Sequence, residues 1–115
     1  MLFSFFSWNN SYYAIGTNQV AIYQTNDFGQ TWTKQFNIST YLTGIFNFDN
    51  KLIAFVKDQI FLVTMTSTTI NFKEIVNDGL TGKIITTIAK SNGMVYISTN
   101  QGIYERPYTN FYTYK

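Results

Sequence analysis

Apolar residues along the chain either alternate with polar ones or form short runs of β-branched and aromatic residues between clusters of Asn, Asp, Gly and Ser. Both arrangements are typical of β-strands joined by turns. The one segment that also fits a helix, residues 82–91, is rich in Ile and Thr, which favour a strand. The pattern therefore predicts an all-β chain.

The apolar runs repeat. Similar four-residue runs begin at Tyr13, Ile53 and Val95, and we align these three residues with one another. Turn-forming residues recur on both sides of these runs, as Asn9-Asn10, Asp49-Asn50 and Asn92-Gly93 before them and Asn18-Gln19, Asp58-Gln59 and Asn100-Gln101 after them. An interval of about 40 residues is typical of a repeated four-stranded unit. We therefore predict a single domain, residues 1–115, with antiparallel units at about residues 1–39, 40–80 and 81–115.

Turn residues divide each predicted unit into four strands. The expected strands are residues 2–8, 12–17, 20–25 and 31–36, then 41–48, 51–57, 60–65 and 71–76, and finally 83–89, 94–99, 102–106 and 110–114. A shift of forty residues also places Trp32 on Phe72, and Phe111 follows a shorter hairpin in the third unit. The aromatic residues therefore recur together with the turns.

One run has a more specific spacing than the rest. Residues 25–32 read Thr-Asn-Asp-Phe-Gly-Gln-Thr-Trp and fit the pattern Ser/Thr-x-Asp-x-Gly-x-Thr-Trp. Asp27 can accept hydrogen bonds from backbone N–H groups of its own turn, and Gly29 can adopt a positive φ. Trp32 then offers a large ring to bury against the hairpin. We interpret the motif as structural, not as a calcium or ligand site, with the residues Thr25, Asp27, Gly29, Thr31 and Trp32.

In these positions the run resembles the Asp-box, the bacterial neuraminidase repeat of sialidases, sortilin-type receptors and photosystem-assembly propellers. The resemblance implies four-stranded β-propeller blades, with the motif between the third and fourth strands on the outer rim, away from any active centre. Only the first unit has the complete motif, because Ser67 and Thr69 take the places of Asp27 and Gly29 in the second unit. The corresponding hairpin of the third unit contains Pro107 and Asn110.

Three blades are too few for a ring, since propellers close with about four to eight. An open arc would expose broad apolar faces of its first and last sheets. We therefore expect a second copy or another protein chain to complete the ring, or the chain to be part of a longer propeller. A closed monomeric β-sandwich with a fortuitous repeat is the alternative.

Composition excludes several classes of function. Charged residues make up only 12% of the chain, and the net charge of +2 comes from scattered lysines, so there is no basic patch for nucleic acid. The chain has no Cys and no His, which removes disulfides, thiolate metal sites and the usual general base. No run approaches the roughly 20 apolar residues of a membrane-spanning helix. The apolar start, residues 1–8, is short for a signal peptide and predicts a strand.

The residue inventory also argues against catalysis. Sialidases, to which the resemblance points, clamp the substrate carboxylate with three arginines and use a tyrosine nucleophile, whereas this chain has Arg106 alone. Other glycosidases need two carboxylates about 5 to 10 Å apart, and the acidic residues here fall mostly in predicted turns and outer strands. Asn77-Asp78-Gly79 offers oxygen ligands for calcium but is also a plain turn signal. We expect no enzymatic activity, no cofactor and no metal site.

Binding is the more plausible class. Loops between second and third strands gather on one face of a propeller, so a polar rim is predicted from Asn18, Gln19, Asp58, Gln59, Asn100 and Gln101. Amides beside aromatic rings suit sugars, although tight turns also favour Asn and Asp for conformational reasons. A structural or interaction module is our main expectation; a glycan-binding lectin or a fragment of a sialidase-like hydrolase are the alternatives. Asn-x-Ser triplets at Asn9 and Asn37 are compatible with a virion or cell-surface protein.

Overall fold

The computed structural model describes residues 3–16, 21–38, 42–48, 50–66 and 68–115. These residues form antiparallel β-sheets and one short 3₁₀ helix, so the all-β prediction is confirmed. Residues 82–91, which also fitted a helix, lie mainly in strand β9, as the Ile and Thr content predicted. Among the described residues, no helix has the length and hydropathy needed to cross a membrane.

The strands form three sheets in the order of the sequence. Sheet 1 has the order β1 (Phe3–Trp8), β2 (Ser11–Gly16), β3 (Ala21–Thr25), β4 (Thr33–Asn37). Sheet 2 has the order β5 (Gly44–Phe48), β6 (Lys51–Val56), β7 (Gln59–Met65), β8 (Ile70–Ile75). Sheet 3 has the order β9 (Ile85–Ser91), β10 (Met94–Thr99), β11 (Gly102–Pro107). Most of these bounds lie close to those predicted from the turns.

Left-handed backbone recurs in the turns that join the first two strands of each sheet. The β1–β2 turn consists of Asn9 and Asn10, with φ of 50° and 65°, and Asn50 in the β5–β6 turn has φ 61°. Asn92 and Gly93 join β9 to β10 with φ of 52° and 77°. Hairpins favour such turns because their twist matches that of the strands, and Asn and Gly adopt positive φ most readily.

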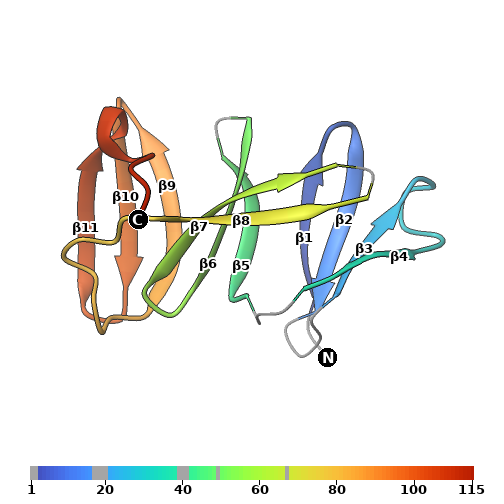
Figure 1. Cartoon of the computed structure of the whole chain (residues 1–115), viewed down its shortest axis with the longest axis horizontal. Coiled ribbons are helices and arrows are strands. Elements are labelled where there is room, and N and C mark those ends of the chain that lie inside the picture. Colours follow the sequence, from blue (N-terminus) through green and yellow to red (C-terminus); the bar gives the residue numbers. More distant parts are fainter. Residues whose placement is uncertain (1–2, 17–20, 39–41, 49, 67) are drawn as a thin grey trace.

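Sheet 2 lies between sheets 1 and 3 (Figure 1). Its residues alternate between two cores, as the two-residue period of a strand requires. Leu52 and Ala54 of β6 join the core shared with sheet 1, whereas Ile53 and Phe55 join the core shared with sheet 3. Because both faces are covered, β6 is a nearly continuous apolar strand.

The alignment of Val95 with Ile53 is wrong. The turns show the true register, since Ser11 follows the first turn, Lys51 the second and Met94 the third. Val95 therefore corresponds to Leu52. A shift of one residue moves a side chain to the opposite face of a strand. With the corrected register, each sheet turns the same face towards the sheet before it, because Leu52 faces sheet 1 and Val95 faces sheet 2.

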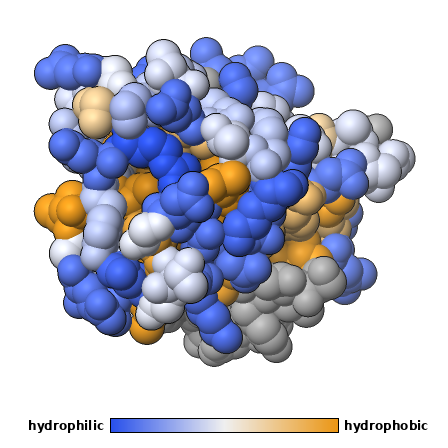
Figure 2. Space-filling model, turned by 60° about the vertical axis from the view of Figure 1, so that its left-hand side comes forward, coloured by the Kyte–Doolittle hydropathy of each residue, from blue (hydrophilic) through white to orange (hydrophobic). Residues whose placement is uncertain are grey.

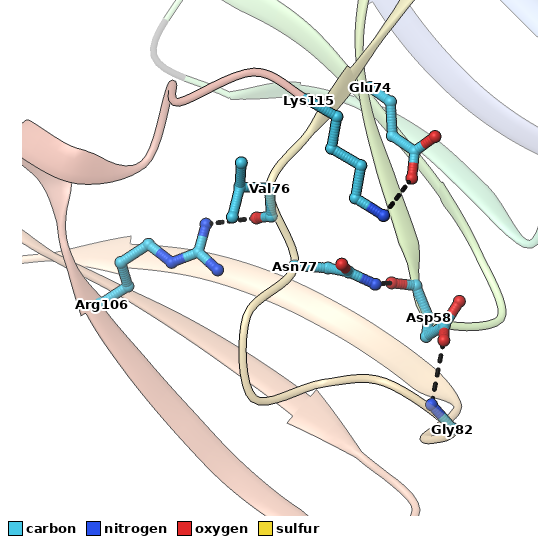
Figure 3. Close-up of polar contacts among 7 residues, drawn as sticks. All are labelled: Asp58, Glu74, Val76, Asn77, Gly82, Arg106 and Lys115. Carbon is cyan, nitrogen blue, oxygen red and sulfur yellow. Dashed lines mark hydrogen bonds and ion pairs between the residues drawn. The ribbon is translucent and has the colours of Figure 1, made fainter.

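The fourth strand predicted for the third unit, residues 110–114, is also wrong. After β11 the chain forms the 3₁₀ helix η1 (Tyr108–Asn110) and then pairs with sheet 2, where Val76 donates its N–H to the Thr113 carbonyl at 2.6 Å. Lys115 forms an ion pair with Glu74 at 2.8 Å (Figure 3). Two features divert the chain: Pro107 offers no N–H to a further strand at the free edge of β11, and Phe111 is completely buried in the core between sheets 2 and 3.

Candidate functional site

The turn between β3 and β4, residues 25–32, is held by a compact set of hydrogen bonds. The buried Thr25 hydroxyl donates to Asp27 Oδ1 at 2.8 Å and accepts the Gly29 N–H at 2.9 Å. Asp27 also accepts the Thr31 N–H at 2.9 Å and the Thr31 hydroxyl at 2.5 Å. Gly29 has φ 89°, as the motif predicted. The Asp27 carboxylate is thus fully engaged within its own turn.

These hydrogen bonds change the acidity of Asp27. The Thr31 hydroxyl, the Thr31 N–H and the Thr25 hydroxyl together lower the pKa of Asp27 to about 2. Donors to a carboxylate stabilise its charged form. Among the described residues, no group of three or more His, Cys, Asp or Glu side chains is arranged to hold a metal ion. The geometry gives Asp27 a conformational role in the hairpin.

Beside this turn, the outer face of sheet 1 carries exposed aromatic side chains. Phe28 is 89% exposed, Phe5 67%, Tyr12 53% and Trp32 38%. The rings of Phe5 and Trp32 lie 6.0 Å apart, those of Tyr12 and Phe28 lie 6.4 Å apart, and the Trp32 indole N–H donates to the Gly29 carbonyl at 3.1 Å. Together with Thr25 and Gly29 they line a hollow of about 300 Å³. We call this surface the aromatic face.

The aromatic face corresponds to surfaces that are covered in the other two sheets. In the repeat register, Phe5 and Tyr12 match Ile45 and Leu52, which are buried against sheet 1. The corresponding residues of sheet 3, Ile88 and Val95, are buried against sheet 2. Sheet 1 therefore presents to solvent the face that its neighbours use for packing.

A second hollow of about 520 Å³ adjoins the aromatic face. Turn residues from two neighbouring sheets supply its polar groups, and it shares Tyr12 and Phe28 with the aromatic face. Asn47 of β5 donates its side-chain N–H to the carbonyl of Ser7 in β1 at 3.4 Å, which links sheets 1 and 2 beside their first turns. The lining residues are Ser7, Trp8, Asn9, Asn10, Ser11, Tyr12, Phe28, Asn47 and Asn50.

The structure describes only part of the predicted polar rim. Asn18 and Gln19 lie outside the described residues. Asp58 accepts the Gly82 N–H at 2.9 Å, and its carbonyl accepts the Asn77 side-chain N–H at 2.7 Å (Figure 3), so it anchors the loop between β8 and β9. Asn100 accepts the Ile84 N–H at 3.0 Å. These two side chains fasten loops to one another.

The remaining rim residues lie at strand ends. Gln59 is the first residue of β7 and is half-buried. Gln101 is exposed in the β10–β11 turn, where its N–H donates to the Thr99 hydroxyl at 3.0 Å. The described rim residues therefore hold turns and loops, and the structure brings aromatic rings and amides together elsewhere, at the β1–β2 and β5–β6 turns.

Arg106, the arginine that a carboxylate clamp would require, has a structural partner. Its guanidinium donates to the Val76 carbonyl at 2.7 Å (Figure 3) and lies 6.0 Å from the Phe111 ring. Burial lowers the pKa of Arg106, and the nearby Asp78 carboxylate opposes this effect. The side chain thus connects β11 to the loop after β8.

The aromatic face was not anticipated from the sequence, although a signal for it exists. Residues 12–15 of β2, Tyr-Tyr-Ala-Ile, are apolar or aromatic at consecutive positions, which indicates burial on both sides of a strand. The structure covers one side only. No family model matches the chain, and no curated protein matches it as a relative.

Proposed function

We propose that the chain is a non-enzymatic interaction module, made of propeller-like blades of the Asp-box type, which assembles with a second copy of the chain through the aromatic face of sheet 1. The observation that carries the proposal is the exposure of Phe5, Tyr12, Phe28 and Trp32 on a face that is buried in the other sheets. Contiguous exposed aromatic side chains of this kind mark interaction surfaces.

Further observations support the same proposal. The Asp-box turn has the local geometry that its residue pattern implies, and successive sheets turn the same face towards the preceding sheet. That arrangement is the one a propeller repeats around its axis. Asp27, Asp58 and Arg106 each have partners within the fold. These polar groups therefore serve the architecture of the module.

The test measures the fluorescence of Trp32 and the mass of the protein in solution. In a Trp8→Phe variant, Trp32 is the only tryptophan, because the chain has two. We expect the mass from light scattering to rise above that of a single chain as the protein concentration increases, and acrylamide quenching of Trp32 fluorescence to fall in parallel. A monomer with equally accessible Trp32 at every concentration would overturn the proposal.

Glycan binding is the second candidate, and the hollow at the Asn9-Asn10 turn favours it. Side-chain amides and the rings of Trp8 and Tyr12 line the same space, so hydroxyl groups and an apolar sugar face would both find partners. Titration with a neutral disaccharide such as lactose should shift the resonances of these residues, and Asn47→Ala should weaken the effect. Gln101→Ala, on the originally predicted rim, should not. If Gln101→Ala alone abolished the lactose-induced shifts, the glycan site would lie on that rim.

A further inference from the structure

The inference concerns the partner that the aromatic face takes, and it rests on the proposed function. We infer that this face binds the same face of a second copy about a twofold axis, with Phe28 of each copy inserted into the hollow of the other. The sheets of a two-copy ring would instead have to meet head to tail, sheet 3 against sheet 1. Three features of the molecule favour the twofold contact over the head-to-tail contact.

The first feature is the polar outer face of sheet 3. Where sheet 2 has Phe46, Ile53 and Phe55 facing sheet 3, the matching residues of sheet 3 are Ala89, Tyr96 and Ser98. Glu105 is also exposed there. Figure 2, turned so that the sheet 3 side comes forward, shows mainly hydrophilic residues with hydrophobic ones between them.

A head-to-tail contact would bury this polar surface. Taking a carboxylate such as that of Glu105 out of water is costly unless it gains a partner. Among the described residues, the exposed side chains at the centre of the aromatic face are uncharged: Phe5, Tyr12, Phe28 and Trp32. Lys34 shares that face only from the edge strand β4, where its amine can stay in solvent. The outer face of sheet 3 is therefore a poor partner for sheet 1.

The second feature is self-complementarity. A projecting group and a hollow occur on the same surface, since Phe28 is 89% exposed and borders the apolar hollow of about 300 Å³. A cavity of about 150 Å³ is enough to hold a benzene ring. A twofold contact uses the same patch on both copies, so each copy supplies a ring and receives one.

Two polar groups on the aromatic face would lose little on burial. The Trp32 N–H already donates to the Gly29 carbonyl, and the Thr25 hydroxyl is already engaged with Asp27 and Gly29. Buried polar groups are costly mainly when they lack hydrogen bonds. The surface can therefore be covered by a second uncharged, aromatic surface.

The third feature is the backbone at Phe28. Its φ of 58° lies in the left-handed region, which bulky residues rarely adopt. Packing in the protein's own core does not compensate for this conformation, because the ring points into solvent. Such a conformation persists when surrounding contacts determine it, and here the Thr25 hydroxyl accepts the Gly29 N–H and Asp27 accepts the Thr31 N–H on either side of Phe28. The turn thus holds an aromatic ring outward, ready for insertion.

The test compares Phe28→Asn with Ile103→Asn by sedimentation velocity. Asn adopts positive φ readily, so Phe28→Asn should fold with an unchanged or higher midpoint of thermal unfolding. Ile103 is the matched control, because it is 72% exposed on the outer face of sheet 3, which a head-to-tail contact would bury. We expect a wild-type dimer with twice the mass of one chain. Phe28→Asn should raise the dissociation constant at least about tenfold, whereas Ile103→Asn should leave it unchanged.

Each other outcome overturns a defined statement. Association that both variants weaken indicates a head-to-tail contact, which refutes the twofold inference and leaves the proposed function intact. Association that Ile103→Asn alone weakens uses the outer face of sheet 3 without the aromatic face, which refutes both the inference and the proposed function. A wild-type dimer that neither variant weakens refutes the insertion of Phe28. A monomeric wild type at every concentration refutes both the inference and the proposed function.

Discussion

At the scale of single residues, Asp27 shows how one carboxylate can organise a hairpin through hydrogen bonds within its own turn. Its oxygens accept hydrogen bonds from Thr25 and Thr31, and the Thr25 hydroxyl in turn binds the Gly29 N–H. The residue pattern alone predicted this local structure, because the donors and acceptors lie close together in the chain. The exposure of Phe28 in the same turn could not be predicted, since the variable positions of the motif carry no signal about the surroundings.

Acid should weaken the hairpin through Asp27. Its pKa is lowered to about 2 in the folded chain, below the ordinary value of 3.8, so the folded state favours the charged carboxylate. The resulting stabilisation is fully present above the unfolded pKa and is lost as the pH falls from about 5 towards 2. Asp27→Asn should therefore lower the midpoint of thermal unfolding by several degrees at neutral pH.

The pH dependence of that difference is the decisive measurement. The midpoints of wild type and Asp27→Asn should converge as the pH falls through the same window, because groups common to both proteins cancel in the comparison. A difference that stays constant down to about pH 2 would mean that the charge of Asp27 contributes nothing to the hairpin.

At the scale of elements, the third repeat departs from the first two after β11. The strand prediction for residues 110–114 followed from the turn residues that divide each repeat and from the recurring aromatic position of Phe111, but Phe111 is buried between sheets 2 and 3 and the following residues pair with β8. The same residues fit both a fourth strand in sheet 3 and an edge partner for sheet 2. Pro107, which lacks an N–H, favours the second arrangement.

Removal of the Phe111 ring should reveal how firmly the end of the chain is packed. The side chain is fully buried and its ring lies 5.5 Å from that of Phe48. Phe111→Ala should lower the free energy of unfolding by about 3–5 kcal/mol, because a large cavity opens between two sheets. Urea denaturation monitored by circular dichroism measures the change.

Thr109→Ala provides the matched control, since Thr109 is exposed in the neighbouring 3₁₀ helix. Its effect should stay within about 0.5 kcal/mol. Equal effects of the two substitutions would show that the segment after β11 does not contribute to the core.

At the scale of the whole molecule, the two ends of the sheet stack differ. The outer face of sheet 3 is mainly polar around the exposed Ile103, whereas that of sheet 1 carries four exposed aromatic side chains. A stack of sheets needs a partner at only one outer face when the residues of the other outer face are mainly polar and can stay in water. The expectation that association completes a ring treated both ends alike. The difference between them appears only when residues are assigned to faces through the strand register.

The sequence by itself determined the local features: strands from alternating apolar residues, hairpins from Asn9-Asn10 and Asn92-Gly93, and the turn of residues 25–32 from its eight-residue pattern. These depend on contacts between residues close in the chain. Only the tertiary structure decided that residues after η1 join sheet 2 and that the aromatic face stays uncovered. Apolar residues are similar on both faces of a central strand. Hydrogen-bond register and packing between distant segments therefore determine which face is buried and which segments pair.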